Sequence, residues 1–222
     1  LSGGTAVLLK TTRHNKLVSA HIFFGNVKSQ EPIPGLAHQT LQLMLKGTRA
    51  YTAQEIALIS ESKGAQISAD LDWDYAAFSV MSPQFNFEEQ LHLLFEILNH
   101  PRLDSEELKK IQFETLQNLK TRQEQTFNTA YDRLQKELFG NQGLPVLGTP
   151  DSAQKINLSD IRKIYSEQVQ NQAKVISIVG HFNPRKVKKI IRQNTSDWKM
   201  KNQKNSFQGE VNQAFKEIKI KE

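Results

Sequence analysis

The order of the predicted strands and helices is the feature that most constrains this fold. Strands come in adjacent pairs, first Thr5–Lys10 with Leu17–Phe24, and later Ala65–Leu71 with Tyr75–Ser82. Adjacent strands joined by a short connection pair antiparallel, whereas a parallel pair needs a long crossover between its strands. We therefore predict an α+β fold, a mostly antiparallel sheet with helices packed on one face.

End signals and apolar periodicity predict where the helices lie. Thr52 with Glu55 three residues later is a capping box, and Asp104 or Ser105 and Ser159 are good first residues for two further helices. Gly47, Gly64 and Gly140 end three of them. The predicted helices are Leu36–Lys46, Ala53–Lys63, Phe87–Asn99, 105–125, Phe127–Phe139, Ser159–Gln170 and Pro184–Arg192, with a loop over Asn141–Pro150 and a buried strand over Lys174–Gly180.

Composition excludes several classes of protein. The chain has 222 residues and no cysteine, so it has no disulfide and no Cys-ligated zinc or iron–sulfur site. No apolar run approaches the roughly 18–20 residues that a membrane-spanning helix needs. Cysteine usage leaves the cellular compartment open, and the start at Leu1 suggests a processed product or a segment of something longer.

The net charge of +6 is concentrated at one end of the chain. Residues 183–222 hold 11 Lys or Arg and 4 Asp or Glu, a net +7, so residues 1–182 carry −1. Such a cluster could bind nucleic acid or an anionic membrane. The helix Arg185–Arg192 lacks interleaved aromatic residues and the chain has no nucleic-acid motif, so we interpret the cluster as a solvated helix face and a linker and expect no nucleic-acid partner.

The segment GLAHQTLQLMLKGT, Gly35–Thr48, resembles the signature of the pitrilysin/insulinase metallopeptidases, the family whose helix carries H-x-x-E-H. The resemblance extends to mitochondrial processing peptidase-like proteins. Further matches follow in the family's order: Lys46-Gly47-Thr48, Lys63-Gly64-Ala65, His100-Pro101, Val179-Gly180-His181-Phe182 and Trp198. We expect a lobe of this family over residues 1–198, and over 199–222 a basic linker with a possible last strand, Glu210–Lys221, leading to a second lobe.

The resemblance implies a zinc site that this chain has lost. The family's two histidines and a distal glutamate bind zinc, and the glutamate of the motif is the general base. The matching positions here are His38, then Leu41 for the base, Gln42 for the second ligand and Asn118 for the distal ligand. Glu114, one turn earlier, could be recruited only by a register shift. Leucine cannot accept a proton and carboxamides are poor zinc ligands, so we expect no bound zinc, no other cofactor and no catalytic residue.

The resemblance also implies a use for an inactive lobe. Family members pair homologous lobes as a clamshell around a peptide, and one half is commonly degenerate. We expect a non-catalytic lobe or subunit, a metallopeptidase homologue inactive alone, that supports a zinc-bearing homologous partner in a dimer, such as a heterodimer. Two alternatives stay open: a scaffold without a proteolytic role, and an active zinc metallopeptidase with an unconventional site.

By the same analogy, substrate peptide adds a strand to the sheet edge near the metal helix. The family also uses an Arg/Tyr pair from a later lobe, a region beyond this chain. The residues that we expect to bind peptide are Ala65, Gln66, Ile67, Ser68 and Ala69.

Overall fold

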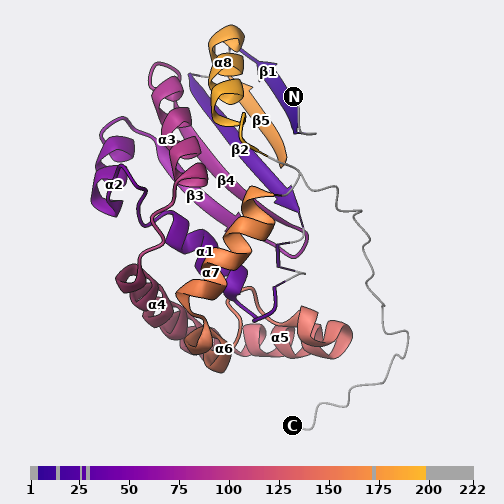
Figure 1. Ribbon diagram of the computed structural model, residues 1–222. Helices are drawn as coiled ribbons and strands as arrows, with labels where there is room; N and C mark the ends of the chain where they lie inside the picture. The colour runs from indigo at the N-terminus through magenta and orange to yellow at the C-terminus, as the bar shows by residue number, and fades with distance from the viewer. Residues whose placement is uncertain (1–4, 14–15, 26, 29–30, 172–173, 199–222) are drawn as a thin grey trace.

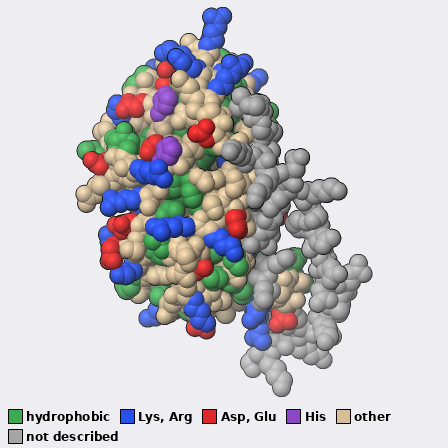
Figure 2. Space-filling view, viewed as in Figure 1, with side chains coloured by type: hydrophobic (Ala, Val, Ile, Leu, Met, Phe, Trp, Pro, Cys, Tyr) green, Lys and Arg blue, Asp and Glu red, His purple; other side chains and the backbone are tan. Residues whose placement is uncertain are grey.

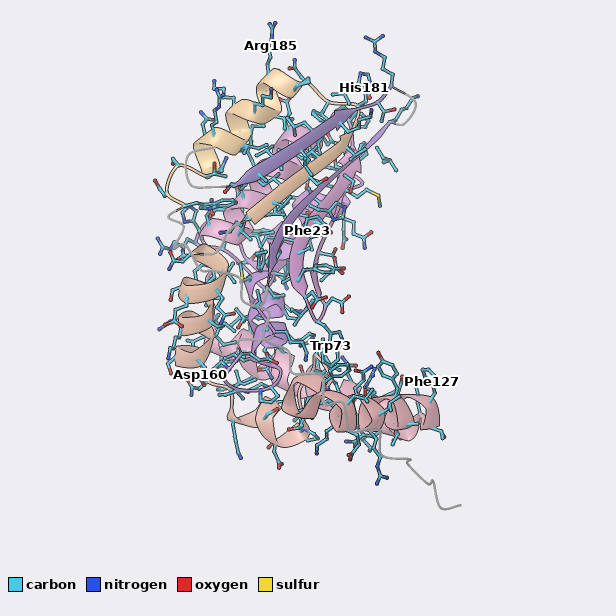
Figure 3. All side chains as sticks on the ribbon, turned by 90° about the vertical axis from the view of Figure 1, so that its right-hand side faces the viewer. Phe23, Trp73, Phe127, Asp160, His181 and Arg185 are labelled. Carbon is cyan, nitrogen blue, oxygen red and sulfur yellow. The ribbon has the colours of Figure 1, made fainter. Side chains whose placement is uncertain are left out.

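The computed structural model describes residues 5–13, 16–25, 27–28, 31–171 and 174–198. These residues form the predicted α+β lobe, one sheet with helices on one of its faces (Figures 1 and 3). The linker and last strand expected over 199–222 lie outside the described residues. The helices are α1 (Leu36–Met44), α2 (Ala53–Glu61), α3 (Phe87–Asn99), α4 (Ser105–Glu124), α5 (Thr126–Phe139), α6 (Pro150–Lys155), α7 (Leu158–Ile164) and α8 (Pro184–Asn194).

The described sheet has five strands in the order β1-β5-β2-β4-β3. Three of its four pairings are antiparallel, and only β1 runs parallel to β5, so the prediction of a mostly antiparallel sheet is confirmed. The long stretch between β4 and β5 contains five of these helices, α3 to α7, and lets β5 insert between β1 and β2. The strands are β1 (Ala6–Thr11), β2 (Leu17–Gly25), β3 (Gln66–Leu71), β4 (Tyr75–Pro83) and β5 (Lys174–Gly180).

One face of the sheet supplies the core. Alternate residues of β2, β4 and β5 are fully buried there, because successive side chains of a strand point to opposite faces. Phe24 and Phe78 stack across neighbouring strands with ring centroids 6.0 Å apart. α3 packs on β4 and α8 packs on α3, and Phe87 and Phe182 meet between them. The other face of the sheet carries no helix among the described residues (Figure 3).

The helix ends follow their signals with two exceptions. The capping box at Thr52 and the cap at Asp104 are confirmed. The predicted cap at Ser159 is wrong, because Asn157 accepts the amide hydrogen bonds of Ser159 and Asp160 at the start of α7. The predicted single helix also changes winding at Tyr165, so that a π-helix, η2 (Tyr165–Gln170), follows α7.

The loop predicted over Asn141–Pro150 is also more structured than expected. A 3-10 turn, η1 (Gly140–Gly143), opens it, and α6 begins at Pro150. Thr149 and Ser152 form a capping box, and a proline at the first helical position is favourable because its missing N–H would have no partner there. Ser152 Oγ also donates to Pro34 O at 2.8 Å, which joins this loop to the start of α1.

Two glycines permit that close approach. A Cβ on Gly35 would lie 2.5 Å from Leu147 O, and a Cβ on Gly148 would lie 2.3 Å from Pro34 O. Both residues also have positive φ, 89° and 80°, which side chains with a Cβ rarely adopt. The two loops can therefore approach this closely only because Gly35 and Gly148 have no side chain.

We expect Gly148→Ala to destabilise the lobe by about 3–5 kcal/mol, since it adds a backbone clash to the strain of positive φ. Gly64→Ala is the matched control: φ is 63° there, but its Cβ would meet only Pro83 at 3.6 Å. That change should cost about 1–2 kcal/mol. Urea unfolding followed by circular dichroism measures both, and equal losses would contradict the proposed clash.

Candidate functional site

α1 holds three of the four positions that match the family's zinc site. Its first residue has no side-chain cap of its own, because Gly35 precedes it. The Glu31 carboxylate takes over that role by accepting hydrogen bonds from Gly35 N at 3.2 Å and Ala37 N at 2.9 Å. α1 packs against α4, α7 and β3, so its orientation is fixed on several sides.

His38 lies largely buried on α1. Its Nδ1 has no hydrogen-bond partner among the described residues. Burial lowers the pKa of His38 from 6.5 to about 4, because a desolvated imidazolium is costly. The imidazole is therefore neutral at pH 7, the form that can ligate a metal.

The other three positions do not supply what His38 would need. Leu41 is 1% exposed and belongs to the hydrophobic core. Gln42 is half-buried and offers a neutral amide. Asn118 is exposed on α4, whose buried face is formed by Leu108, Ile111, Thr115 and Leu119, and Glu114 is exposed as well.

This donor set does not fit zinc. A zinc site needs several imidazole, thiolate or carboxylate ligands around one point, and here a single imidazole stands among leucine and amides. Across the part of the chain that the structure describes, no three His, Cys, Asp or Glu side chains gather in a way that could hold a metal ion. Leu41 has no group that can take a proton from water, so no metal-dependent hydrolysis can be derived from α1.

Sequence reasoning missed Glu31, whose carboxylate caps the start of α1. Burial raises the pKa of Glu31 from 4.5 to about 7, and the hydrogen bonds from Ala37 N and Gly35 N oppose that change only partly. Nearby, Lys28 Nζ lies 3.9 Å from the centroid of the Trp73 ring. A carboxylate four residues before a glycine that opens a helix is the signal that could have indicated this cap.

The expected peptide-binding strand lies at an edge of the described sheet. β3 pairs with β4 on one side and also contacts α1. Asp72 N donates to Tyr75 O at 2.8 Å, so this pair is hydrogen-bonded, and the register makes Ser68 with Ser79 another such pair. The backbone of Gln66, Ser68 and Asp70 therefore faces β4, and that of Ile67, Ala69 and Leu71 faces the open edge.

The bare face of the sheet presents aromatic and aliphatic side chains. His21 stacks on Phe23 at 5.6 Å between centroids, and Phe23 meets Tyr75 edge-on at 5.7 Å. Ser19 and His21 are joined by a hydrogen bond of 2.9 Å. Further apolar side chains on these strands are exposed: Leu8, Met81, Val175 and Val179.

α5 adds a second exposed apolar surface. None of its residues is buried, and it projects from the foot of the sheet on the side of the bare face (Figure 3). Arg122 holds it to α4 through two hydrogen bonds to Asp132, at 2.7 and 2.6 Å. Phe127, Tyr131, Leu134 and Leu138 are exposed at a helical spacing of four, three and four residues.

Two partly buried groups, Glu31 and His38, give opposite pH dependences. The raised pKa of Glu31 means that folding stability falls as pH rises from 4.5 to about 7, by on the order of 3 kcal/mol. The lowered pKa of His38 means that stability is lost as pH falls from 6.5 to about 4. The stability of Glu31→Gln relative to wild type should therefore be higher at pH 7 than at pH 4.5. The stability of His38→Gln relative to wild type should be higher at pH 4 than at pH 7.

Urea unfolding at several pH values measures these differences. Glu55→Gln is the control for Glu31→Gln, because Glu55 is an exposed capping carboxylate whose pKa is lowered by hydrogen bonds from Thr52. Its loss should cost more at neutral than at acidic pH, the reverse of Glu31→Gln. Parallel pH profiles for Glu31→Gln and wild type would contradict the burial argument.

Comparison with known proteins gives the same family as α1 suggests. Residues 6–149 match the model of the insulinase family, peptidase family M16. A Bacillus subtilis (strain 168) protein named uncharacterized zinc protease YmxG is 24% identical over 193 residues, 84% of this chain and 47% of its own length. The non-peptidase homolog YmxG of Helicobacter pylori is 26% identical over 164 residues, 72% of this chain and 38% of its own length.

Solved structures share the fold. The peptidase M16 inactive domain from Pseudomonas fluorescens superposes with a TM-score of 0.79 at 22% identity, covering 88% of this chain and 48% of that one. A protease from Helicobacter pylori gives 0.83 at 19% identity, covering 95% and 52%. The chain thus spans about half the length of these proteins. With the family's model matched over most of the described lobe, the chain belongs to the insulinase family, peptidase family M16.

Proposed function

We propose that this chain is a non-catalytic lobe of a zinc-peptidase-like assembly, which binds peptide and supports a zinc-bearing partner. One observation carries the proposal. The helix that matches the family's zinc helix keeps His38, but it places Leu41 in the core and offers an amide at Gln42. A lobe so built has no general base and no ligand set, so any proteolysis has to come from another lobe.

The partner in this proposal is a homologous lobe, in the same polypeptide or in a separate subunit of a heterodimer. The lengths of the relatives support it, since this chain covers 47% of the Bacillus protein and 48% of the Pseudomonas structure. The names of two relatives, inactive domain and non-peptidase homolog, are consistent with a lobe that has lost catalysis.

Peptide binding is supported by the edge of β3 and the bare face beside it. The open edge offers N–H and C=O groups of Ile67 and Ala69 to an extended chain, and main-chain hydrogen bonds of this kind accept many sequences. The exposed aromatic side chains of the bare face and of α5 could contact apolar side chains of the same peptide. A permanent protein partner could use these apolar surfaces as well, which is the scaffold alternative.

The first test concerns zinc. Purified protein should contain substoichiometric zinc by mass spectrometry, unchanged by His38→Ala. The double variant Gln42→His/Asn118→Glu should bind zinc stoichiometrically, because it restores a histidine one turn from His38 and a carboxylate on α4. Gln42→Ala/Asn118→Ala is the matched control. Stoichiometric zinc in wild type that depends on His38 would overturn the proposal and favour an active peptidase.

The second test concerns the edge of β3. Ala69→Pro removes an N–H that faces the open edge, so the lobe should still fold while binding of fluorescein-labelled casein, an unstructured polypeptide, falls at least about ten-fold. Ser68→Ala, whose backbone faces β4, should bind casein as wild type does. Fluorescence anisotropy measures binding. No casein binding by wild type would favour the scaffold, and equal binding by Ala69→Pro would place the peptide elsewhere.

A further inference from the structure

α8 has two chemically opposite faces. Val187, Ile190 and Ile191 are buried against the lobe. The opposite side carries Arg185, Lys188, Lys189 and Arg192, which together line a shallow surface hollow. Their spacing of three, four and seven residues puts them on one side of the helix. We call these four side chains the α8 basic face.

Little negative charge balances this face. Between His181 and Ser196 the sequence has five Lys or Arg and no Asp or Glu. Lys186, beside the face, pairs with Glu88 at 3.2 Å. Within the described residues, none of the four side chains of the α8 basic face has a carboxylate within ion-pairing distance. Since α8 also has no acidic residue in its first turn, its positive end adds to the same potential.

An exposed aromatic residue stands next to the α8 basic face. Phe85 is 80% exposed, and it lines one surface hollow together with His181 and Arg185. Figure 3 shows His181 and Arg185 at the same end of the lobe, and in Figure 2 Lys and Arg side chains gather at that end. Moving a phenyl ring this exposed from water into an apolar phase is favourable.

We propose that the α8 basic face and Phe85 dock the lobe on the surface of an anionic phospholipid bilayer. Lys and Arg side chains near such a surface each contribute about 1 kcal/mol, and an aromatic ring beside them can enter the interface. A nucleic-acid duplex would use the cations but has no apolar layer for Phe85. No helix in the described part of the chain is long and apolar enough to span a bilayer, so this contact is peripheral.

This docking does not depend on the proposed role in peptide binding. α8 lies at the other end of the lobe from α4 and α5 (Figure 1). Binding to a bilayer at α8 would therefore leave the surface of α5 and the part of β3 that leads toward Trp73 accessible. The casein and zinc experiments concern the edge of β3 and α1, and the experiment below concerns α8 and Phe85.

Sedimentation with vesicles tests the docking. We expect the protein to bind vesicles of phosphatidylcholine mixed with phosphatidylglycerol at low salt and to be released at high salt. It should not bind vesicles of pure phosphatidylcholine. Lys188→Gln/Lys189→Gln should weaken binding about 25-fold, from about five-fold for each lost charge. Phe85→Ser should weaken it about ten-fold, since the ring no longer enters the apolar layer.

The control removes the same charge at the other end of the lobe. Lys120→Gln/Lys155→Gln changes exposed residues of α4 and α6 and should bind as wild type, and circular dichroism checks that all variants fold. Equal binding to neutral vesicles, or equal losses in both double variants, would overturn the proposal. So would tighter binding to a DNA duplex than to anionic vesicles with no effect of Phe85→Ser, which would indicate nucleic acid instead.

Discussion

The structure depends on burying one face of a five-stranded sheet under helices. Alternate residues of β2, β4 and β5 point into that layer, and the buried side of each helix has to match them. Because all the helices that pack on the sheet use this face, the other face keeps its side chains accessible. The same constraint therefore produces both the stable core and the exposed surface of Phe23 and Tyr75 beside the edge of β3.

The core also bears on the helix that resembles the family's zinc helix. α1 is held at its start by Glu31 and by the crossing at Gly35 and Gly148. With Leu41 in the core, α1 contributes packing at the position that the resemblance matches to the family's general base. An apolar side chain at such a buried position avoids the desolvation cost of a carboxylate, which suits a well-packed lobe. His38 remains as a neutral, desolvated imidazole.

The remaining chemistry lies on surfaces rather than in a cavity. The stripe on α5 is at one end of the lobe, the α8 basic face with Phe85 is at the other, and the edge of β3 runs along the sheet between them. These surfaces present groups that lack partners within the described lobe: outward backbone N–H and C=O groups at Ile67 and Ala69, and four cations on α8. An arrangement of this kind suits a protein that works by contact with other molecules.

The sequence by itself determined the fold class, the places of the strands, the capped starts at Thr52 and Asp104, and the residue types at the positions that resemble the family's zinc site. These are local properties: side-chain period, end signals and the chemistry of single residues. The sequence did not indicate α6, the π-helix after Tyr165, or the parallel pairing of β1 with β5, because these depend on contacts between distant segments. Only the tertiary structure decided that Glu31 caps α1, that the backbone of Ile67 and Ala69 faces the open edge, and that Phe85 lies beside Arg185. The reason is that burial, the hydrogen-bonding register of the strands and the proximity of distant residues exist only once the chain has folded.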